Sequence, residues 1–174
     1  MWKKYALNVN GAAAVLSPLE WHCIGPVQSN KTRLVAENFD WVQSVDRLKI
    51  AQRLSEQRPS GLPPLHICLQ VNLDGGANKS GVPASEVLAL AKEVAQLPGL
   101  VLRGLMSIPE PAADFVAACA VHQRTKDLFD AINASGELPA RMDTLSMGMT
   151  ADLEAAIHSG STMVRVGTAI FGVR

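Results

Sequence analysis

Two short glycine turns near the end of the chain carry the residue types that bind phosphate. The first lies in residues 145–150 (LSMGMT) and the second in residues 163–172 (MVRVGTAIFG). In each, an apolar run typical of a buried strand leads through small or hydroxyl-bearing residues into the start of a helical pattern. Small residues let a ligand approach the backbone, and the N–H groups at a helix start favour an anion. The pair predicts a phosphate site; the alternative is two ordinary strand-to-helix connections.

Strand-like segments alternate with helical ones along the chain and must position these turns. The two C-terminal runs begin at Leu145 and at Met163, and the second is expected to form a strand over residues 163–167. Four earlier runs have the same character, at residues 20–24, 41–45, 65–73 and 101–108. A regular strand–helix alternation predicts a parallel sheet whose strands follow the order of the chain.

A helical pattern follows each strand-like run. Ser29 is expected to cap a helix with Leu34, Val35 and Phe39 on its buried face, and Asp46 to cap the next helix. The most regular pattern spans residues 83–97, with one apolar stripe made of Val87, Leu90, Ala91 and Val94.

Length and topology favour different versions of this fold. A chain of 174 residues suits one domain with an open, doubly wound sheet of six strands. An eight-fold (β/α) barrel usually needs about 250 residues, or at least about 200. Two successive phosphate turns at the end of the chain, however, match the phosphate site after the last two strands of such a barrel. From the pattern alone, both architectures stay open.

Composition excludes several classes of function. The 16 Lys and Arg balance the 16 Asp and Glu, so the zero net charge gives no reason to expect nucleic acid or a membrane surface as partner. No run reaches the ~18 apolar residues of a membrane span. The widely separated Cys23, Cys68 and Cys119 form neither a disulfide framework nor a zinc motif, so we expect no metal and a cytoplasmic location.

Several separate motifs, in order, resemble one known family. They are WHCIGPVQSNK at residues 21–31, SVDR at 44–47, KSG at 79–81, RGLMSIP at 103–109, LSMGM at 145–149 and RVGTAIFG at 165–172. From about residue 19 to residue 174 the chain is similar to the pyridoxal phosphate homeostasis proteins, relatives of the barrel domain of alanine racemase. The resemblance implies a TIM-barrel-like (β/α) parallel barrel that is incomplete, with strands 3 to 8 present and the first two missing. Residues 1–174 would form a single partial domain of this kind.

The resemblance also implies a cofactor, pyridoxal 5′-phosphate (PLP), and a set of residues that bind it. Arg165 is expected to point toward the pyridine nitrogen of the cofactor. Because a guanidinium cannot accept a proton, the ring would stay unprotonated and be a poor electron sink, which argues against strong carbanion chemistry but still suits a racemase. The residues expected to hold the phosphate are Ser146, Gly148, Met149, Gly167 and Thr168. No catalytic residue is expected.

One residue of the family has no counterpart in this sequence. Family members hold PLP as a Schiff base on a lysine at the end of the first strand, and no lysine here matches that position; Lys31 and Lys79 are interpreted as surface residues. We therefore expect a PLP-binding protein of intracellular cofactor homeostasis, not an enzyme, that binds weakly and without a covalent bond. A racemase-type PLP enzyme and a non-functional truncated fragment are the alternatives. His22 could face the cofactor or make a hydrogen bond in the core.

Open sheet edges are a further expectation of an incomplete barrel. The gap should lie between the strands at residues 20–24 and 163–167. The full-length relatives are expected to be monomeric, but unpaired edges invite pairing with a second chain, so this chain should self-associate.

Overall fold

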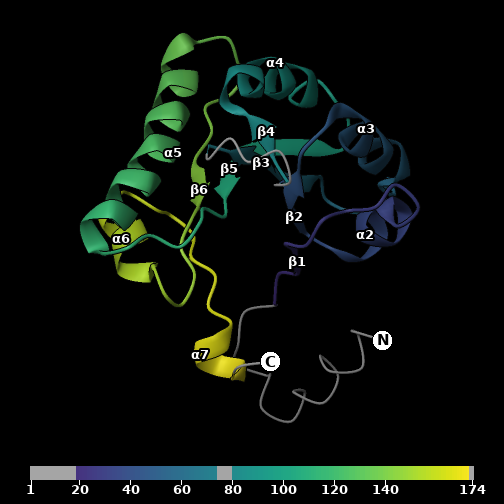
Figure 1. The fold of residues 1–174 in the computed structure, drawn as a ribbon. Helices are drawn as coiled ribbons and strands as arrows, with labels where there is room; N and C mark the ends of the chain where they lie inside the picture. Colours follow the sequence, from purple (N-terminus) through teal and green to yellow (C-terminus); the bar gives the residue numbers. More distant parts are fainter. Residues whose placement is uncertain (1–18, 74–79, 173–174) are drawn as a thin grey trace.

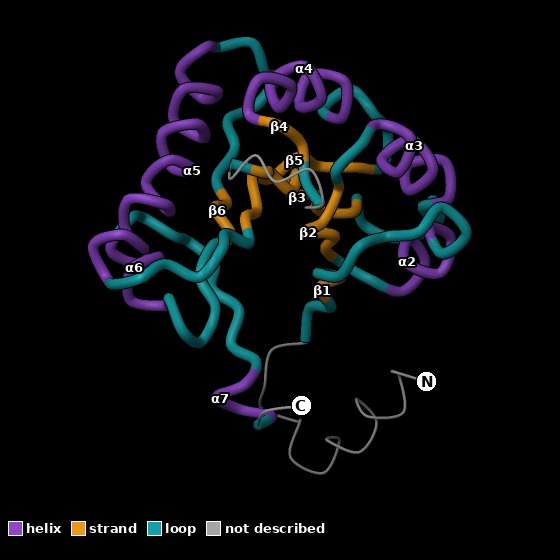
Figure 2. Tube along the Cα trace, viewed as in Figure 1, coloured by secondary structure: helices purple, strands orange, loops and turns teal. Residues whose placement is uncertain are grey.

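A curled parallel sheet organises the part of the chain described by the computed structural model, residues 19–73 and 80–172. All its pairings are parallel, in the order β1-β2-β3-β5-β6, with β4 paired to β3. The strands form an incomplete ring in Figures 1 and 2. Their bounds are β1 His22–Cys23, β2 Trp41–Val45, β3 Leu65–Asn72, β4 Val82–Pro83, β5 Leu100–Ser107 and β6 Thr144–Ser146.

Helices lie on the outside of this ring (Figure 2). A short final helix, α7, lies away from the sheet and buries none of its residues. The helices with described positions are α2 Thr32–Asn38, α3 Leu48–Gln57, α4 Ala84–Val94, α5 Phe115–Ser135, α6 Leu153–His158 and α7 Thr168–Phe171. Within the described residues, none of them is long and apolar enough to cross a membrane.

Two hydrophobic clusters occupy the two faces of the sheet. Successive side chains of a strand point to opposite faces, so Ile67 and Leu69 of β3 pack with the helices in the larger, outer core. On the concave face, Cys68 packs with Trp41 and Met106 in a smaller cluster that Met163 covers. The sheet is therefore covered on both faces, as the nearly continuous apolar run in β3 predicts.

The close contact between β5 and β6 depends on one glycine. A Cβ atom at Gly104 would lie 1.6 Å from the carbonyl oxygen of Thr144, which belongs to the neighbouring strand. No side chain fits there, because the atom in the way is backbone and cannot move without separating the strands.

Most predicted elements are present, with two differences in the sheet. The two-residue strand β4 was not predicted, since Pro83 and its place at the start of a helix hide it in the sequence. The strand predicted over residues 163–167 is reduced to a single bridge between Ser146 and Met163. No further described strand lies beside this segment to form a ladder with it, and β1 at the other end of the sheet pairs only with β2 among the described strands.

Three helix predictions also differ from the structure. Neither predicted cap is correct: the N-cap residue is Lys31 in α2 and Arg47 in α3, and neither side chain makes a capping hydrogen bond. Leu34 is 59% exposed, whereas the buried face of α2 is formed by Thr32, Val35 and Ala36. The apolar stripe predicted for residues 83–97 is confirmed, because all four of its residues are buried in α4.

Candidate functional site

A cavity of about 630 Å³ opens at the carboxyl end of the strands, on the concave side of the sheet. Residues that follow β1, β5 and β6 line it, together with the segment that leads to α7. Its polar wall consists of His22, Gln43, Thr150, Arg165 and Thr168, and its apolar wall includes Ile24, Ile108, Met149, Met163, Val164 and Val166. We call it the Arg165 cavity.

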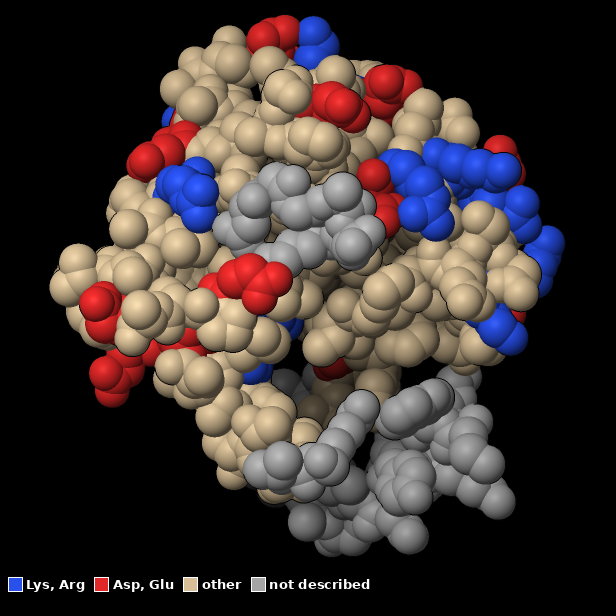
Figure 3. Space-filling model, viewed as in Figure 1, with Lys and Arg blue, Asp and Glu red and all other residues tan. Residues whose placement is uncertain are grey.

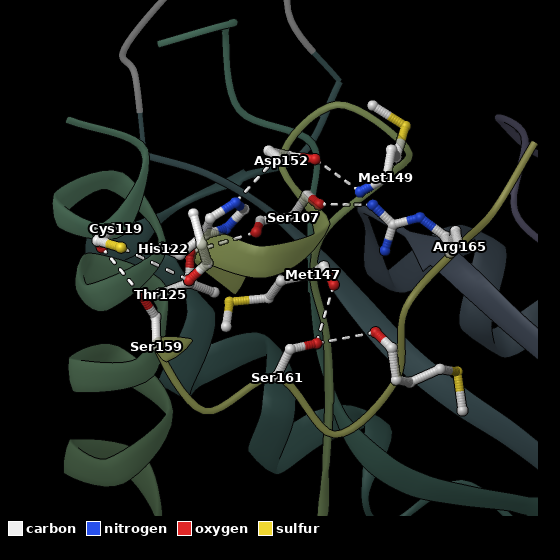
Figure 4. A network of polar contacts seen from close by, with 12 residues as sticks. Ser107, Cys119, His122, Thr125, Met147, Met149, Asp152, Ser159, Ser161 and Arg165 are labelled. Carbon is white, nitrogen blue, oxygen red and sulfur yellow. Dashed lines mark hydrogen bonds and ion pairs between the residues drawn. The ribbon is translucent and has the colours of Figure 1, made fainter. Parts of the chain in front are cut away.

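Arg165 is fixed in this wall by two hydrogen bonds. Its Nη1 donates to Ser146 Oγ at 2.7 Å, and its Nη2 donates to the carbonyl oxygen of Ser107 at 2.9 Å (Figure 4 draws the latter). Burial lowers the pKa of the guanidinium, and the nearby Asp152 carboxylate opposes that shift. A guanidinium has five N–H donors, so donors remain for a ligand in the cavity.

Ser146 lies behind Arg165 and is fully buried. Its hydroxyl donates to Gln43 Oε1 at 2.7 Å. Gln43 in turn directs its Nε2 toward His22 Nδ1 at 2.8 Å and Met163 Sδ at 3.0 Å. The structure thus joins β1, β2, β6 and the segment after β6 through one line of polar side chains.

The turn after β6 is held by Asp152. One oxygen of this carboxylate accepts from the backbone N–H of Met149 at 2.7 Å, and the other lies 2.9 Å from His122 Nε2 of α5 (Figure 4). Gly148 has a φ of +89°, and a Cβ there would lie 2.5 Å from Ala156 Cβ in α6. The turn therefore requires glycine at this position both for its backbone conformation and for its packing.

The second glycine turn is open to solvent. Gly167 and Thr168 are exposed and line the cavity. In the described part of the chain, their backbone N–H groups donate to no acceptor, whereas the carbonyl oxygen of Gly167 accepts from Ile170 and Phe171. These N–H groups are available to an anion.

A stack of rings lies on the same concave face, next to the cavity. His22, Trp41 and His66 are aligned across β1, β2 and β3, with ring centroids 5.1 and 4.6 Å apart. Arg103 lies 4.8 Å from the Trp41 ring centroid and makes two hydrogen bonds to Asp143, at 2.8 and 2.9 Å. Burial lowers the pKa of both histidines, so both favour the neutral form at pH 7.

Neither thiol on the sheet has the character of a nucleophile. Burial raises the pKa of Cys68 to about 12 and also raises the pKa of Cys23. A thiol with a raised pKa is protonated and unreactive at neutral pH. The described residues contain no cluster of side chains that could hold a metal ion.

A second cavity, of about 610 Å³, lies on the other side of the turn after β6. Residues 149–151 separate it from the Arg165 cavity. Its charged lining is acidic, from Glu110, Asp114, Asp152 and Glu154, and acidic side chains gather over the α6 side in Figure 3. Carboxylates repel a phosphate, so the Arg165 cavity is the better candidate despite its similar size.

Of the six residues predicted to bind a cofactor, four line the Arg165 cavity: Met149, Arg165, Gly167 and Thr168. Ser146 contacts Arg165 from behind, and Gly148 shapes the turn without lining the cavity. His22 makes the hydrogen bond that was one of its two possible roles, to Gln43, and its side chain also lines the cavity. Two polar lining residues were not predicted, Gln43 and Thr150. Thr150 could have been suspected from its hydroxyl in the turn, whereas nothing in the sequence singles out Gln43.

Comparisons with known proteins define the class of the fold. The family model described as alanine racemase, N-terminal domain, matches residues 8–174. Alanine racemase of Clostridium difficile, 16% identical, shares the fold with a TM-score of 0.69 over 98% of this chain and 44% of its own. The fold is therefore of the alanine-racemase class, a curled parallel half-barrel with helices outside.

More similar relatives narrow the class to one family. The pyridoxal phosphate homeostasis protein of Pseudomonas aeruginosa is 60% identical over 99% of this chain and 73% of its own length, and that of Vibrio alginolyticus is 56% identical over 90% of this chain. The chain spans 66% of the Vibrio protein. The structure of PipY from Synechococcus elongatus with PLP bound is 31% identical, with a TM-score of 0.80 over 97% of this chain and 78% of its own. The chain belongs to the pyridoxal phosphate homeostasis protein family.

Proposed function

We propose that this chain binds PLP in the Arg165 cavity and serves to hold and buffer the cofactor in the cytoplasm, without transforming a substrate. The observation that carries the proposal is the guanidinium of Arg165, which two internal hydrogen bonds fix in the cavity wall with donors to spare. The names of the relatives and the PLP-bound structure of PipY support the same ligand.

The residues around the cavity fit the two ends of this cofactor. Arg165 would donate to the pyridine nitrogen, while the exposed N–H groups of Gly167 and Thr168 and the hydroxyl of Thr150 would hold the phosphate. Met149 would contact the cofactor from the apolar wall. Bound PLP supplies an electron sink, which is weak when its ring nitrogen carries no proton.

Ser146 and Gly148, the other two residues predicted to bind the cofactor, would affect its binding indirectly. Ser146 would act by orienting Arg165, because its hydroxyl is already engaged with Gln43. Gly148 would act by shaping the turn that carries Met149 and Thr150.

We further propose that the chain is one partial barrel domain and that the strand-like segments correspond to strands 3 to 8 of a racemase-type barrel. The open ring supports this assignment, since two further strands between the Met163 segment and β1 would close it (Figure 1). Closure would also pair the edges of both segments that have no partner strand among residues 19–73 and 80–172.

Binding should be reversible and non-covalent, because no lysine of the described residues lines the Arg165 cavity. Lys31 is exposed and lines neither of the two cavities, and Lys79 lies outside the described residues. Without a covalent bond, we expect a dissociation constant in the micromolar range or weaker, about −8 kcal/mol at most. Inorganic phosphate should compete with PLP for the site.

The experiment is a PLP titration followed by borohydride reduction and peptide mass mapping. Saturable binding, with no stoichiometric label on any lysine, is the expected result. One fully labelled lysine would refute non-covalent binding, and racemisation of alanine by the loaded protein would then support the racemase alternative. No binding even at high PLP concentration would favour an inert fragment.

A further inference from the structure

The line of polar side chains behind Arg165 has a fixed direction. A guanidinium only donates hydrogen bonds, so Ser146 Oγ accepts from Arg165, and its own proton is directed at Gln43 Oε1. The carbonyl end of the Gln43 amide therefore faces Ser146, and its NH₂ end faces His22.

The Met163 sulfur supports this orientation of the amide. Gln43 Nε2 has two protons, one directed at His22 Nδ1 and the other at Met163 Sδ. A thioether sulfur accepts and never donates, so the opposite orientation would place two acceptors against each other. His22 Nδ1 must then be an acceptor, which puts the proton of the neutral ring on Nε2.

We propose that Gln43 is a positioning residue for Arg165, and that the line Arg165–Ser146–Gln43–His22 couples the protonation of His22 to ligand binding at Arg165. The part that concerns PLP rests on the proposed function. Gln43 is 2% exposed and reaches the cavity wall from β2, on the opposite side of the ring from β6.

Protonation of His22 conflicts with the present arrangement. An N–H on Nδ1 would face the NH₂ of Gln43, donor against donor, so the amide would have to turn over. Its NH₂ would then donate to Ser146 Oγ beside Arg165, the serine proton would lose its acceptor, and Gln43 Oε1 would face the Met163 sulfur. A hydroxyl that no longer donates is a weaker acceptor, so Arg165 would be held less firmly and a ligand that needs it would bind less well.

The groups that face His22 act on its protonation in opposite directions. Burial lowers the pKa of His22 most, Glu20 and Asp40 favour the protonated ring, and His66 opposes it. Trp41 stacks on its ring and carries no charge. A fall in pH below about 6.5, the ordinary pKa of histidine, should therefore move the line of hydrogen bonds from one arrangement to the other.

The test uses the whole chain with ¹⁵N-labelled histidine, and Gln43→Leu, Gln43→Glu and Gln70→Leu variants. Gln70 is the matched control, because it is a second buried glutamine of the sheet, bonded to Ser80 and outside the line. Long-range ¹H–¹⁵N spectra should show His22 protonated on Nε2 in the wild type and in Gln70→Leu. In Gln43→Glu the carboxylate should move the proton to Nδ1, and Gln43→Leu should lose the preference.

Ligand binding is then measured as a function of pH. PLP affinity should fall as His22 becomes protonated in the wild type, and Gln43→Leu should bind about tenfold more weakly at pH 7.5 with that pH dependence gone. In the ligand-free chain, Arg165→Gln should change the His22 titration, since coupling is reciprocal.

Two results would overturn the inference. One is a His22 tautomer that is the same in wild type and Gln43→Leu; the other is a His22 titration that Arg165→Gln leaves unchanged. Both are read without PLP, so they remain decisive even if PLP does not bind, which would refute only the proposed function.

Discussion

Arg165 uses two of its donors inside the protein, on Ser146 and on the Ser107 carbonyl, and its side chain still reaches the cavity. A residue held in this way loses little conformational freedom when a ligand arrives, which favours binding. It is the residue whose replacement should affect the ligand most.

Replacing Arg165 by Gln should weaken PLP binding by about 1.5–3 kcal/mol, the range for a hydrogen bond to a charged group. Titration followed by absorption spectroscopy measures the change. The matched control is Arg33→Gln, which removes an exposed arginine of α2. Equal PLP affinity in the two variants would contradict a direct role for Arg165.

The two stacked histidines predict how stability depends on pH. Because burial lowers the pKa of His22 and His66, the folded chain binds fewer protons than the unfolded chain just below pH 6.5. The free energy of unfolding should therefore decrease as the pH falls from 7.5 to 5.5. Urea unfolding at both pH values measures the slope, which should be smaller in a His22→Asn/His66→Asn variant than in the control His158→Asn. An equal slope in both variants would contradict the prediction.

At the residue scale, the sequence was informative where the chemistry is local. The glycine turns and Arg165 could be found from residue type and order alone. Gln43 could not, because its role depends on Ser146 and Met163, which lie 103 and 120 residues further along the chain.

Elements were predictable where one buried face repeats over several residues. Strands β2, β3 and β5 and the stripe of α4 follow from apolar patterns. The predicted strand at residues 163–167 follows such a pattern too, but a strand needs a partner on which to form a ladder, and the described part of the chain offers only β6. Pairing of this kind is not encoded locally.

The contact between β5 and β6 predicts the effect of one added methyl group. Gly104→Ala would place Cβ against the Thr144 carbonyl, so the strands must separate, at a cost of about 3 kcal/mol. Urea unfolding measures this cost. Gly61→Ala serves as control, since nothing lies within 4 Å of its Cβ, and it should stay within about 0.5 kcal/mol of wild type. Comparable stability of the two variants would contradict the close contact.

At the scale of the whole molecule, the open ring exposes apolar side chains near its ends. Ile24 is 46% exposed after β1, and Ile170 and Phe171 of α7 are 68% and 84% exposed. Exposed apolar groups beside unpaired strand edges favour association with a second chain.

We therefore expect concentration-dependent self-association in sedimentation velocity. An Ile170→Glu/Phe171→Glu variant should associate less, because charge replaces two exposed apolar side chains. Leu34→Glu, which changes an exposed leucine of α2 instead of α7, should associate as the wild type does. A wild-type chain that stays monomeric at all concentrations and unfolds cooperatively at high temperature would contradict the prediction.

The hydrogen bond between Gln43 and Ser146 also has a consequence for the rate of folding. It joins residues 103 positions apart, and every strand pairing that leads from one to the other is parallel and needs a long crossover. Contacts so distant along the chain form slowly, because most of the chain must be ordered before they can be made. During refolding, the helical signal should return early, whereas the capacity to bind PLP should return only with the slowest phase. PLP binding would therefore report when the last strands of the sheet pair.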